Sequence, residues 1–273
     1  MNYQTFKPHA HLESLVKCYW TLEVPNQNDS QRQRIIPDGC IEMIFILGDD
    51  IKRYTCEDEF LIQPRELVVG QITEPFYIEP TGYVNCFAIR FYPYGFANFV
   101  HIPIKELSNR ETPIQLLFGE NPSNELREKI IQATDSQKRI EIVEEFLFDK
   151  LHEKTTIDSI VKTTIDTLLL TKGSTPINTV LKDDLSKRRQ LERKFIKKIG
   201  LSPKQLGKII RLQTALKILL SQQSESFTKI AYESEYYDQA HFNRDFKEFT
   251  GTTPKEFLED KEMMLSTLFY KND

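Results

Sequence analysis

Short segments rich in apolar residues follow one another over the first hundred residues of the chain. They read VKCYWTLEV, CIEMIFIL, ELVVGQI, EPFYIEP and YVNCFAIRFY, and they are rich in aromatic and β-branched residues. Turn sequences such as Pro37-Asp38-Gly39 separate them, which is the pattern of β-strands. Because no long helix separates the segments, we expect an antiparallel sandwich or barrel, of which a cupin-like barrel is one form.

From about residue 104 the apolar residues take the spacing of amphipathic helices. The segments NELREKIIQAT and QKRIEIVEEFLFDKLHE have this spacing, and SIVKTTIDTLLLTKG ends at Lys172-Gly173 as a helix C-cap would. One face of the second segment is apolar and carries Ile140, Val143, Phe146, Leu147 and Leu151. This face either packs on its own domain or forms a dimer seam.

The last hundred residues contain one pattern twice. RKFIKKIGLSPKQL, which begins at Arg193, recurs 51 residues later as RDFKEFTGTTPKEF, which begins at Arg244. Each copy predicts a short helix, a tight turn and a second helix. The inward positions of the second helices are Leu191, Phe195 and Ile199 in the first copy, and Phe242, Phe246 and Phe249 in the second. This arrangement is that of a helix-turn-helix, whose second helix reads bases in the DNA major groove.

Charge strengthens this interpretation. The whole chain has a net charge of −4, yet twelve lysines and arginines face only three acidic residues between Lys182 and Lys217. A charge run of this kind is either a solvated helix face or a binding surface for a polyanion such as DNA. Together with the repeat, it disfavours an all-helical module whose repeated residues serve only packing.

These segments resemble the DNA-binding domain of the AraC/XylS family of bacterial transcription regulators. The resemblance is carried by RQLERKFIKKIGLSPKQL, RLQTALKILL and TKIAYESEYYDQAHFNRDFKEFTGTTPKEF, within about 176–258. It implies seven helices, with a linker helix from about Pro203 to Leu220 between the two helix-turn-helix units.

The resemblance also implies the organisation and the partners of the chain. We expect an α+β protein with a β-rich regulatory or sensor domain over 1–120, a helical linker with a dimerisation role over 121–173, and a DNA-binding domain over 174–262. The expected function is promoter activation, with double-stranded DNA and RNA polymerase as partners. A small-molecule effector and a homodimer are further expectations.

Carried over by position, the resemblance assigns eleven residues to DNA contact. They are Lys187, Arg188, Arg189, Glu192, Arg193 and Lys197 in the first unit, and Gln239, Ala240, His241, Asn243 and Arg244 in the second. Arginine can bind guanine with two hydrogen bonds, and glutamine or asparagine suits adenine, whereas lysines on phosphates set affinity and register. For His241, packing beside Phe242 is an equal alternative.

Some positions depart from the family pattern. The family often has glycine in the turn before each reading helix, and here Leu185 and Glu235 stand there. If the backbone is left-handed, each departure costs roughly 1 kcal/mol. Acidic residues around the second unit (Glu233, Glu235, Asp238 and Asp245) are expected to weaken its contact with DNA.

The N-terminal half offers one candidate ligand residue, Arg90. Because side chains alternate along a strand, Cys86 and Arg90 share one face of CFAIRFY, while Phe87 and Phe91 share the other. Arg90 either holds an anionic ligand inside the β domain or is an exposed strand residue. Trp20 fits a core position better than a pocket wall.

The sequence speaks against an enzyme. The four cysteines (Cys18, Cys40, Cys56 and Cys86) are far apart and form no CxxC pair, which predicts reduced thiols. A DNA-repair alkyl-transfer enzyme with the same module would need a reactive Pro-Cys-His-type cysteine or a four-cysteine zinc site, and neither is present. No nucleotide-binding or hydrolase motif occurs, so no cofactor and no metal are expected.

The chain has no secretion signal and no apolar run of about 20 residues, so a cytoplasmic location without a membrane partner is expected. Two alternatives stay open for the β domain. Either it senses an effector, or it only dimerises and DNA binding is independent of any effector.

Overall fold

Two antiparallel sheets form the N-terminal part of this computed structural model, which describes residues 1–26, 31–56, 59–151, 158–181, 185–221 and 226–260. The six-stranded sheet has the order β1-β2-β9-β4-β7-β10, and the four-stranded sheet has the order β3-β8-β5-β6. The first sheet consists of β1 (Asn2–Phe6), β2 (Val16–Val24), β4 (Ile41–Ile46), β7 (Glu66–Val69), β9 (Val84–Phe91) and β10 (Glu111–Pro113). The second consists of β3 (Gln33–Ile35), β5 (Ile51–Tyr54), β6 (Phe60–Ile62) and β8 (Phe76–Pro80).

Alternation along the strands gives the six-stranded sheet two buried faces. On β9, Phe87 and Phe91 belong to one apolar cluster, whereas Cys86 and Ala88 belong to another that includes residues of the second sheet. The predicted antiparallel sandwich within an α+β protein is therefore confirmed, and its two sheets are open rather than closed into a barrel.

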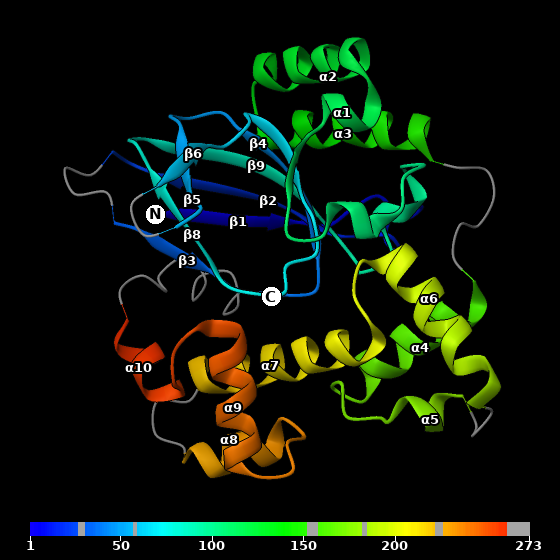
Figure 1. Cartoon of the computed structure of the whole chain (residues 1–273). Helices are drawn as coiled ribbons and strands as arrows, with labels where there is room; N and C mark the ends of the chain where they lie inside the picture. Colours follow the sequence, from blue (N-terminus) through cyan, green and yellow to red (C-terminus); the bar gives the residue numbers. More distant parts are fainter. Residues whose placement is uncertain (27–30, 57–58, 152–157, 182–184, 222–225, 261–273) are drawn as a thin grey trace.

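Helices cover the outer face of the six-stranded sheet (Figure 1). They are η1 (Phe96–Asn98), η2 (Ile104–Leu107), α1 (Gln115–Phe118), α2 (Glu120–Gln132) and α3 (Ser136–Lys150). Ile140, Val143 and Leu147 of α3 are buried in the same cluster as the sheet residues. The apolar face of this helix thus packs on its own domain.

Seven α-helices form the C-terminal part of the described chain, on the other side of the strands in Figure 1. They are α4 (Ser159–Leu170), α5 (Ile177–Val180), α6 (Arg188–Ile199), α7 (Pro203–Ser221), α8 (Phe227–Glu233), α9 (Gln239–Thr250) and α10 (Pro254–Glu259), with η3 (Leu185–Lys187) before α6. Lys182, Asp183 and Asp184 of the basic segment, and residues 261–262 of the expected DNA-binding domain, lie outside the described residues.

The segment expected as a separate linker over 121–173 contributes to two cores. Helices α2 and α3 pack on the β domain, whereas Val161, Ile165 and Leu168 of α4 lie in the core of the C-terminal helices. The expected C-cap after α4 is present, because Gly173 has φ 76° and donates its N–H to the carbonyl of Leu168 at 2.7 Å. No helix of the described residues is long and apolar enough to cross a membrane.

Candidate DNA-binding surface and effector cavity

Helices α6 and α9 have the predicted inward and outward faces. Their inward residues are all buried: Leu191, Phe195 and Ile199 in α6, and Phe242, Phe246 and Phe249 in α9. Both helices end at a left-handed glycine, Gly200 (φ 85°) and Gly251 (φ 79°), at matching positions of the repeat. The next helix begins at a proline after a hydroxyl residue in both copies, and Ser202 and Thr253 each accept a hydrogen bond from an N–H of that helix.

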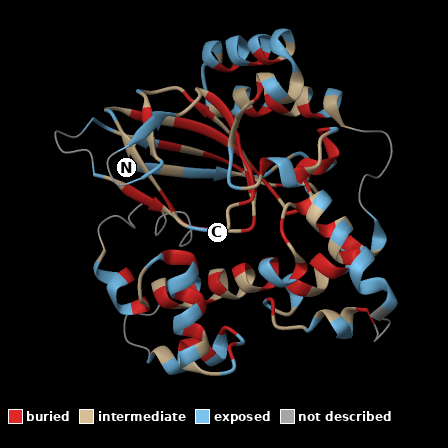
Figure 2. Cartoon of the chain, viewed as in Figure 1, coloured by how far each residue is buried: buried red, intermediate tan, exposed pale blue. Residues whose placement is uncertain are grey.

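Helices α6 and α9 each have exposed as well as buried positions (Figure 2). Lys187, Arg188, Arg189, Arg193 and Lys197 are exposed at the first unit, as are Ala240, Asn243 and Arg244 at the second; Glu192, Gln239 and His241 are half-buried. Neither Arg193 nor Arg244 forms an ion pair or a side-chain hydrogen bond with another described residue. Their guanidinium groups are therefore available to DNA, and the role in DNA contact stays a prediction.

At least four of the predicted residues also have partners within the protein. Arg188 pairs with Glu192 at 3.2 Å, and the side-chain oxygen of Gln239 accepts a hydrogen bond from Thr228 at 2.6 Å. The imidazole of His241 lies edge-on to the ring of Tyr236, with 5.4 Å between the ring centroids. This contact favours the packing alternative for His241.

The two turns without glycine differ from each other. Glu235 has φ 63°, so the second turn has the left-handed backbone that favours glycine. Leu185 instead opens the 3₁₀-helix η3, whose backbone is right-handed, so the expected cost at this residue is absent.

Two of the acidic residues of the second unit, Asp238 and Asp245, have different structural roles. Asp238 is the N-cap of α9, and its side chain accepts a hydrogen bond from the backbone N–H of His241 at 2.7 Å. Asp245 is fully buried and lies 3.1 Å from Nζ of Lys208 on α7. Asp245 is therefore not part of the outward acidic surface, and the weaker DNA contact expected of the second unit stays a prediction.

We expect Lys197→Ala to weaken binding to all DNA sequences by the same factor. The side chain is exposed near the end of α6, where we expect its ammonium group to meet a phosphate rather than a base edge. Titrations at several salt concentrations should give a log K against log [salt] slope that is smaller by about 0.9. Lys129→Ala on α2 is the control, and an equal change of slope in both variants would contradict the assignment.

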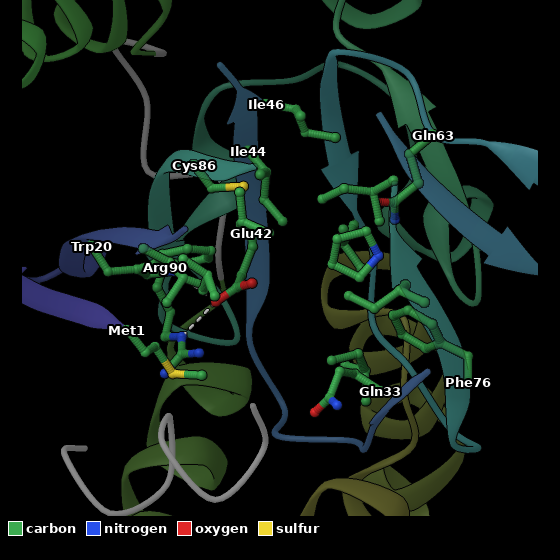
Figure 3. Close-up of a pocket in the computed structure, with 18 of the residues that line it drawn as sticks. Met1, Trp20, Gln33, Glu42, Ile44, Ile46, Gln63, Phe76, Cys86 and Arg90 are labelled. Carbon is green, nitrogen blue, oxygen red and sulfur yellow. Dashed lines mark hydrogen bonds and ion pairs between the residues drawn. The ribbon is translucent and has the colours of Figure 1, made fainter. Parts of the chain in front are cut away.

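A cavity of about 240 Å³ lies between the two sheets of the β domain (Figure 3). Its wall is mainly aliphatic, with polar side chains from both sheets. Trp20 lines it from β2 and is also buried in the apolar cluster between the sheets, so the expected core position is confirmed and the residue contacts the cavity as well. Glu42 lines it from β4, and nothing in the sequence pattern singled this residue out, because a glutamate between two apolar strand residues is ordinarily exposed.

Arg90 lies in the wall of this cavity and is only 2% exposed, which excludes the alternative of an exposed strand residue. Its Nε donates to Glu42 Oε1 at 2.6 Å, and a second nitrogen lies 3.7 Å from a carboxylate oxygen of Asp38. Burial raises the pKa of Glu42, and the neighbouring guanidinium of Arg90 offsets part of this effect.

One segment of the β domain contacts both the cavity and the C-terminal helices. Gln33, Ile35 and Ile36 line the cavity, and Ile36 also belongs to the core of the C-terminal helices. Arg34, on the opposite side of β3, donates to the carbonyl of Thr250 at the end of α9 at 3.3 Å and pairs with Asp260 at 3.1 Å.

Further along the same segment, Gln213 of α7 donates to the carbonyl of Pro37 at 2.6 Å. The first reading helix is also held, because Ser108 donates to the carbonyl of Gly200 at 2.9 Å. The β domain therefore contacts the C-terminal ends of both reading helices and the helix between them.

Two family descriptions match different parts of the chain. One, given as "Domain of unknown function (DUF6597)", matches residues 4–113. The other, given as "Helix-turn-helix domain", matches residues 186–260, which contain the second helix of the first unit and the whole of the second unit. No curated protein matches the sequence.

Solved structures of ToxT from Vibrio cholerae have a similar overall fold. One, at 1.65 Å resolution, is 12% identical with a TM-score of 0.50, and the match covers 95% of this chain and 98% of that chain. Another, of wild-type ToxT with bound unsaturated fatty acid, is 11% identical with a TM-score of 0.48, over 88% of this chain and 94% of that chain.

The sequence match and the fold agree with the two repeated units. The matched helix-turn-helix region carries exposed basic residues on α6 and an exposed arginine on α9. The similarity in fold to the 1.65 Å structure covers 95% of this chain, from its β domain through its C-terminal helices. The chain therefore carries a helix-turn-helix DNA-binding domain behind an N-terminal β domain.

Proposed function

We propose that this chain is a transcription regulator that binds a small effector in the cavity of its β domain, and that occupancy of the cavity alters DNA binding. The observation that carries the proposal is the double role of residues 33–40, which line the cavity and contact the DNA-binding domain. On this proposal the chain acts by binding and not by catalysis.

The geometry of β3 supports a coupling between the cavity and the DNA-binding domain. Successive side chains of β3 point to opposite faces, so Gln33 and Ile35 meet the cavity while Arg34 meets the end of α9. A ligand that displaces Gln33 or Ile35 therefore moves the backbone that carries Arg34. Because packed elements shift as units, a small displacement here changes where α9 is held.

The placement of the reading helices supports binding to two successive major grooves. Helix α7 has 19 residues, which corresponds to a length of about 28 Å. Helices α6 and α9 lie toward opposite ends of α7 in Figure 1. Successive major grooves on one face of DNA are about 34 Å apart, so one chain can present a reading helix to each.

Promoter activation, RNA polymerase as the protein partner and a homodimer belong to the same proposal and rest on the family resemblance. The alternative is an effector-independent DNA-binding protein whose β domain only dimerises. The contacts of Arg34 and Pro37 with the C-terminal helices favour effector control, because a domain used only for dimerisation needs no such contacts.

Filling the cavity from its wall tests the coupling without knowledge of the effector. We expect Cys86→Phe to change the affinity for a selected DNA site by roughly fivefold or more, although Cys86 lies in the β domain. Arg34→Ala should remove most of this change, because it removes the contact with Thr250 and Asp260. Fluorescence anisotropy of a labelled DNA site measures the affinity of wild type, of both single variants and of the double variant. These four affinities give the coupling free energy between the two substitutions.

Lys52→Ala is the matched control for Arg34→Ala, since it removes an ion pair, with Glu79, in the same four-stranded sheet. This substitution should leave the effect of Cys86→Phe unchanged. If a folded Cys86→Phe protein binds the DNA site with wild-type affinity, cavity and DNA binding are independent, and the effector-independent alternative is correct.

A further inference from the structure

The charged side chains of the cavity gather at one end, and the remainder of the wall is mainly aliphatic, with Gln33 and Gln63 on the opposite wall (Figure 3). Glu42, Arg90 and Trp20 form the polar end together with Asp38, and they come from β4, β9, β2 and the turn after β3. The rest of the wall is mainly hydrocarbon, and it includes Leu22, Ile35, Ile44, Ile78 and Val84. A ligand that fits both parts has an apolar body with one polar group at its end.

Glu42 uses one of its two carboxylate oxygens for its contacts with described residues. Oε1 accepts hydrogen bonds from Arg90 Nε at 2.6 Å and from Trp20 Nε1 at 3.1 Å, whereas no described donor contacts Oε2. Figure 3 shows the Glu42 side chain projecting toward the open space between the two walls. Oε2 is therefore placed to accept a hydrogen bond from a ligand.

Two carboxylates and one guanidinium meet at this end, and Met1 also lines the wall there. The Arg90 guanidinium faces the carboxylates of both Glu42 and Asp38, at 2.6 Å and 3.7 Å. Burial raises the pKa of Glu42, Arg90 lowers it, and the nearby charge of Asp38 raises it. A cation beside Glu42 would compensate the second carboxylate, whereas an anion would meet two like charges.

We propose that the effector is a small apolar amine whose protonated nitrogen binds Glu42 Oε2 while its hydrocarbon part fills the aliphatic region. The inference rests on the proposed function in taking this cavity as the effector site. Arg90 then holds and orients Glu42 instead of receiving an anionic ligand.

Three series of compounds that differ only in the head group test the proposal on the full-length protein. They are alkylamines, alkanols and alkanoic acids of equal chain length, from butyl to decyl, with affinity measured by isothermal titration calorimetry. We expect the best alkylamine to bind wild type at least tenfold more tightly than the alkanoic acid of the same length, because charge-assisted hydrogen bonds are the stronger kind. Tighter binding of the acid, or no binding by any alkylamine, overturns the proposal.

Glu42→Gln keeps the size of the side chain and removes its charge. This variant should bind the alkylamine at least tenfold less tightly while its affinity for the alkanol changes less than twofold. An equal loss for both compounds shows that Glu42 only maintains the cavity and overturns the proposed contact. If the variant does not fold, the comparison of head groups on wild type decides the question.

Measurement of DNA affinity with each compound separates the two proposals. An alkylamine that binds at Glu42 without changing DNA affinity supports the amine site and contradicts effector control through this cavity. An alkanoic acid that binds the cavity and changes DNA affinity supports effector control and overturns the amine specificity.

Discussion

Replacing both Arg193 and Arg244 by alanine should abolish sequence-specific DNA binding at concentrations where the wild type is saturated. Each arginine is exposed on the outward face of its reading helix and has no ion pair within the described chain. Loss of one base-reading arginine costs about 1–3 kcal/mol, and well-separated sites add, so the pair should cost about 2–6 kcal/mol. This cost corresponds to a loss of roughly thirtyfold to ten-thousandfold in affinity.

The measurement begins with selection of fragments of the source genome that bind the purified wild-type protein. Two half-elements about one helical turn apart are expected in the selected fragments, because each chain carries two reading helices. Lys138→Ala on α3 removes an exposed positive charge far from both helices in sequence and is the control. An affinity of the double variant equal to that of this control would refute both base contacts.

Asp245→Ala should lower the free energy of unfolding by about 3 kcal/mol, the largest stability effect that we expect from a single polar residue. Asp245 is fully buried under α9, with Lys208 at 3.1 Å, Arg211 at 3.9 Å and the ring of His241 at 3.5 Å. Its removal leaves two cations of α7 beneath α9 without their shared partner. The second helix-turn-helix unit should therefore be the part that loosens.

Glu248→Ala is the matched control, because Glu248 also pairs with Lys208, at 2.9 Å, but is half exposed to solvent. Surface pairs of this kind contribute about 1 kcal/mol or less. Urea denaturation followed by circular dichroism measures both variants against wild type. If Asp245→Ala is no less stable than Glu248→Ala, the buried ion pairs do not hold α9 on α7.

The helical half of the fold was predictable because its signals are local. Two copies of the same inward positions, a glycine after each reading helix and a proline at the start of the next each act over a few residues. The predicted apolar segments contain β2, β4, β7, β8 and β9. The sequence did not predict β1, β3, β5, β6 and β10, and three of these (β3, β6 and β10) have only three residues, too few to show an alternation.

Both turns lack the glycine that the family often has there, yet the backbones of the two turns differ, and the local sequence did not predict this difference. Glu235 adopts the left-handed backbone that glycine favours, whereas Leu185 enters a 3₁₀-helix. Likewise, Asp238 and Asp245 look alike as acidic residues of one helix, yet one caps the helix and the other is buried under it. Which role each takes depends on neighbours from other elements.

The sequence by itself predicted the two helix-turn-helix units, because the repeat, the basic segment and the helix boundaries are properties of neighbouring residues. Only the tertiary structure showed the cavity of the β domain and the contacts of this domain with the C-terminal helices. Glu42 and Arg90 are 48 residues apart, and Arg34 and Thr250 are 216 residues apart, yet each pair is in contact. Sheet pairing and the packing of one domain on the other bring these residues together, and no local pattern encodes either.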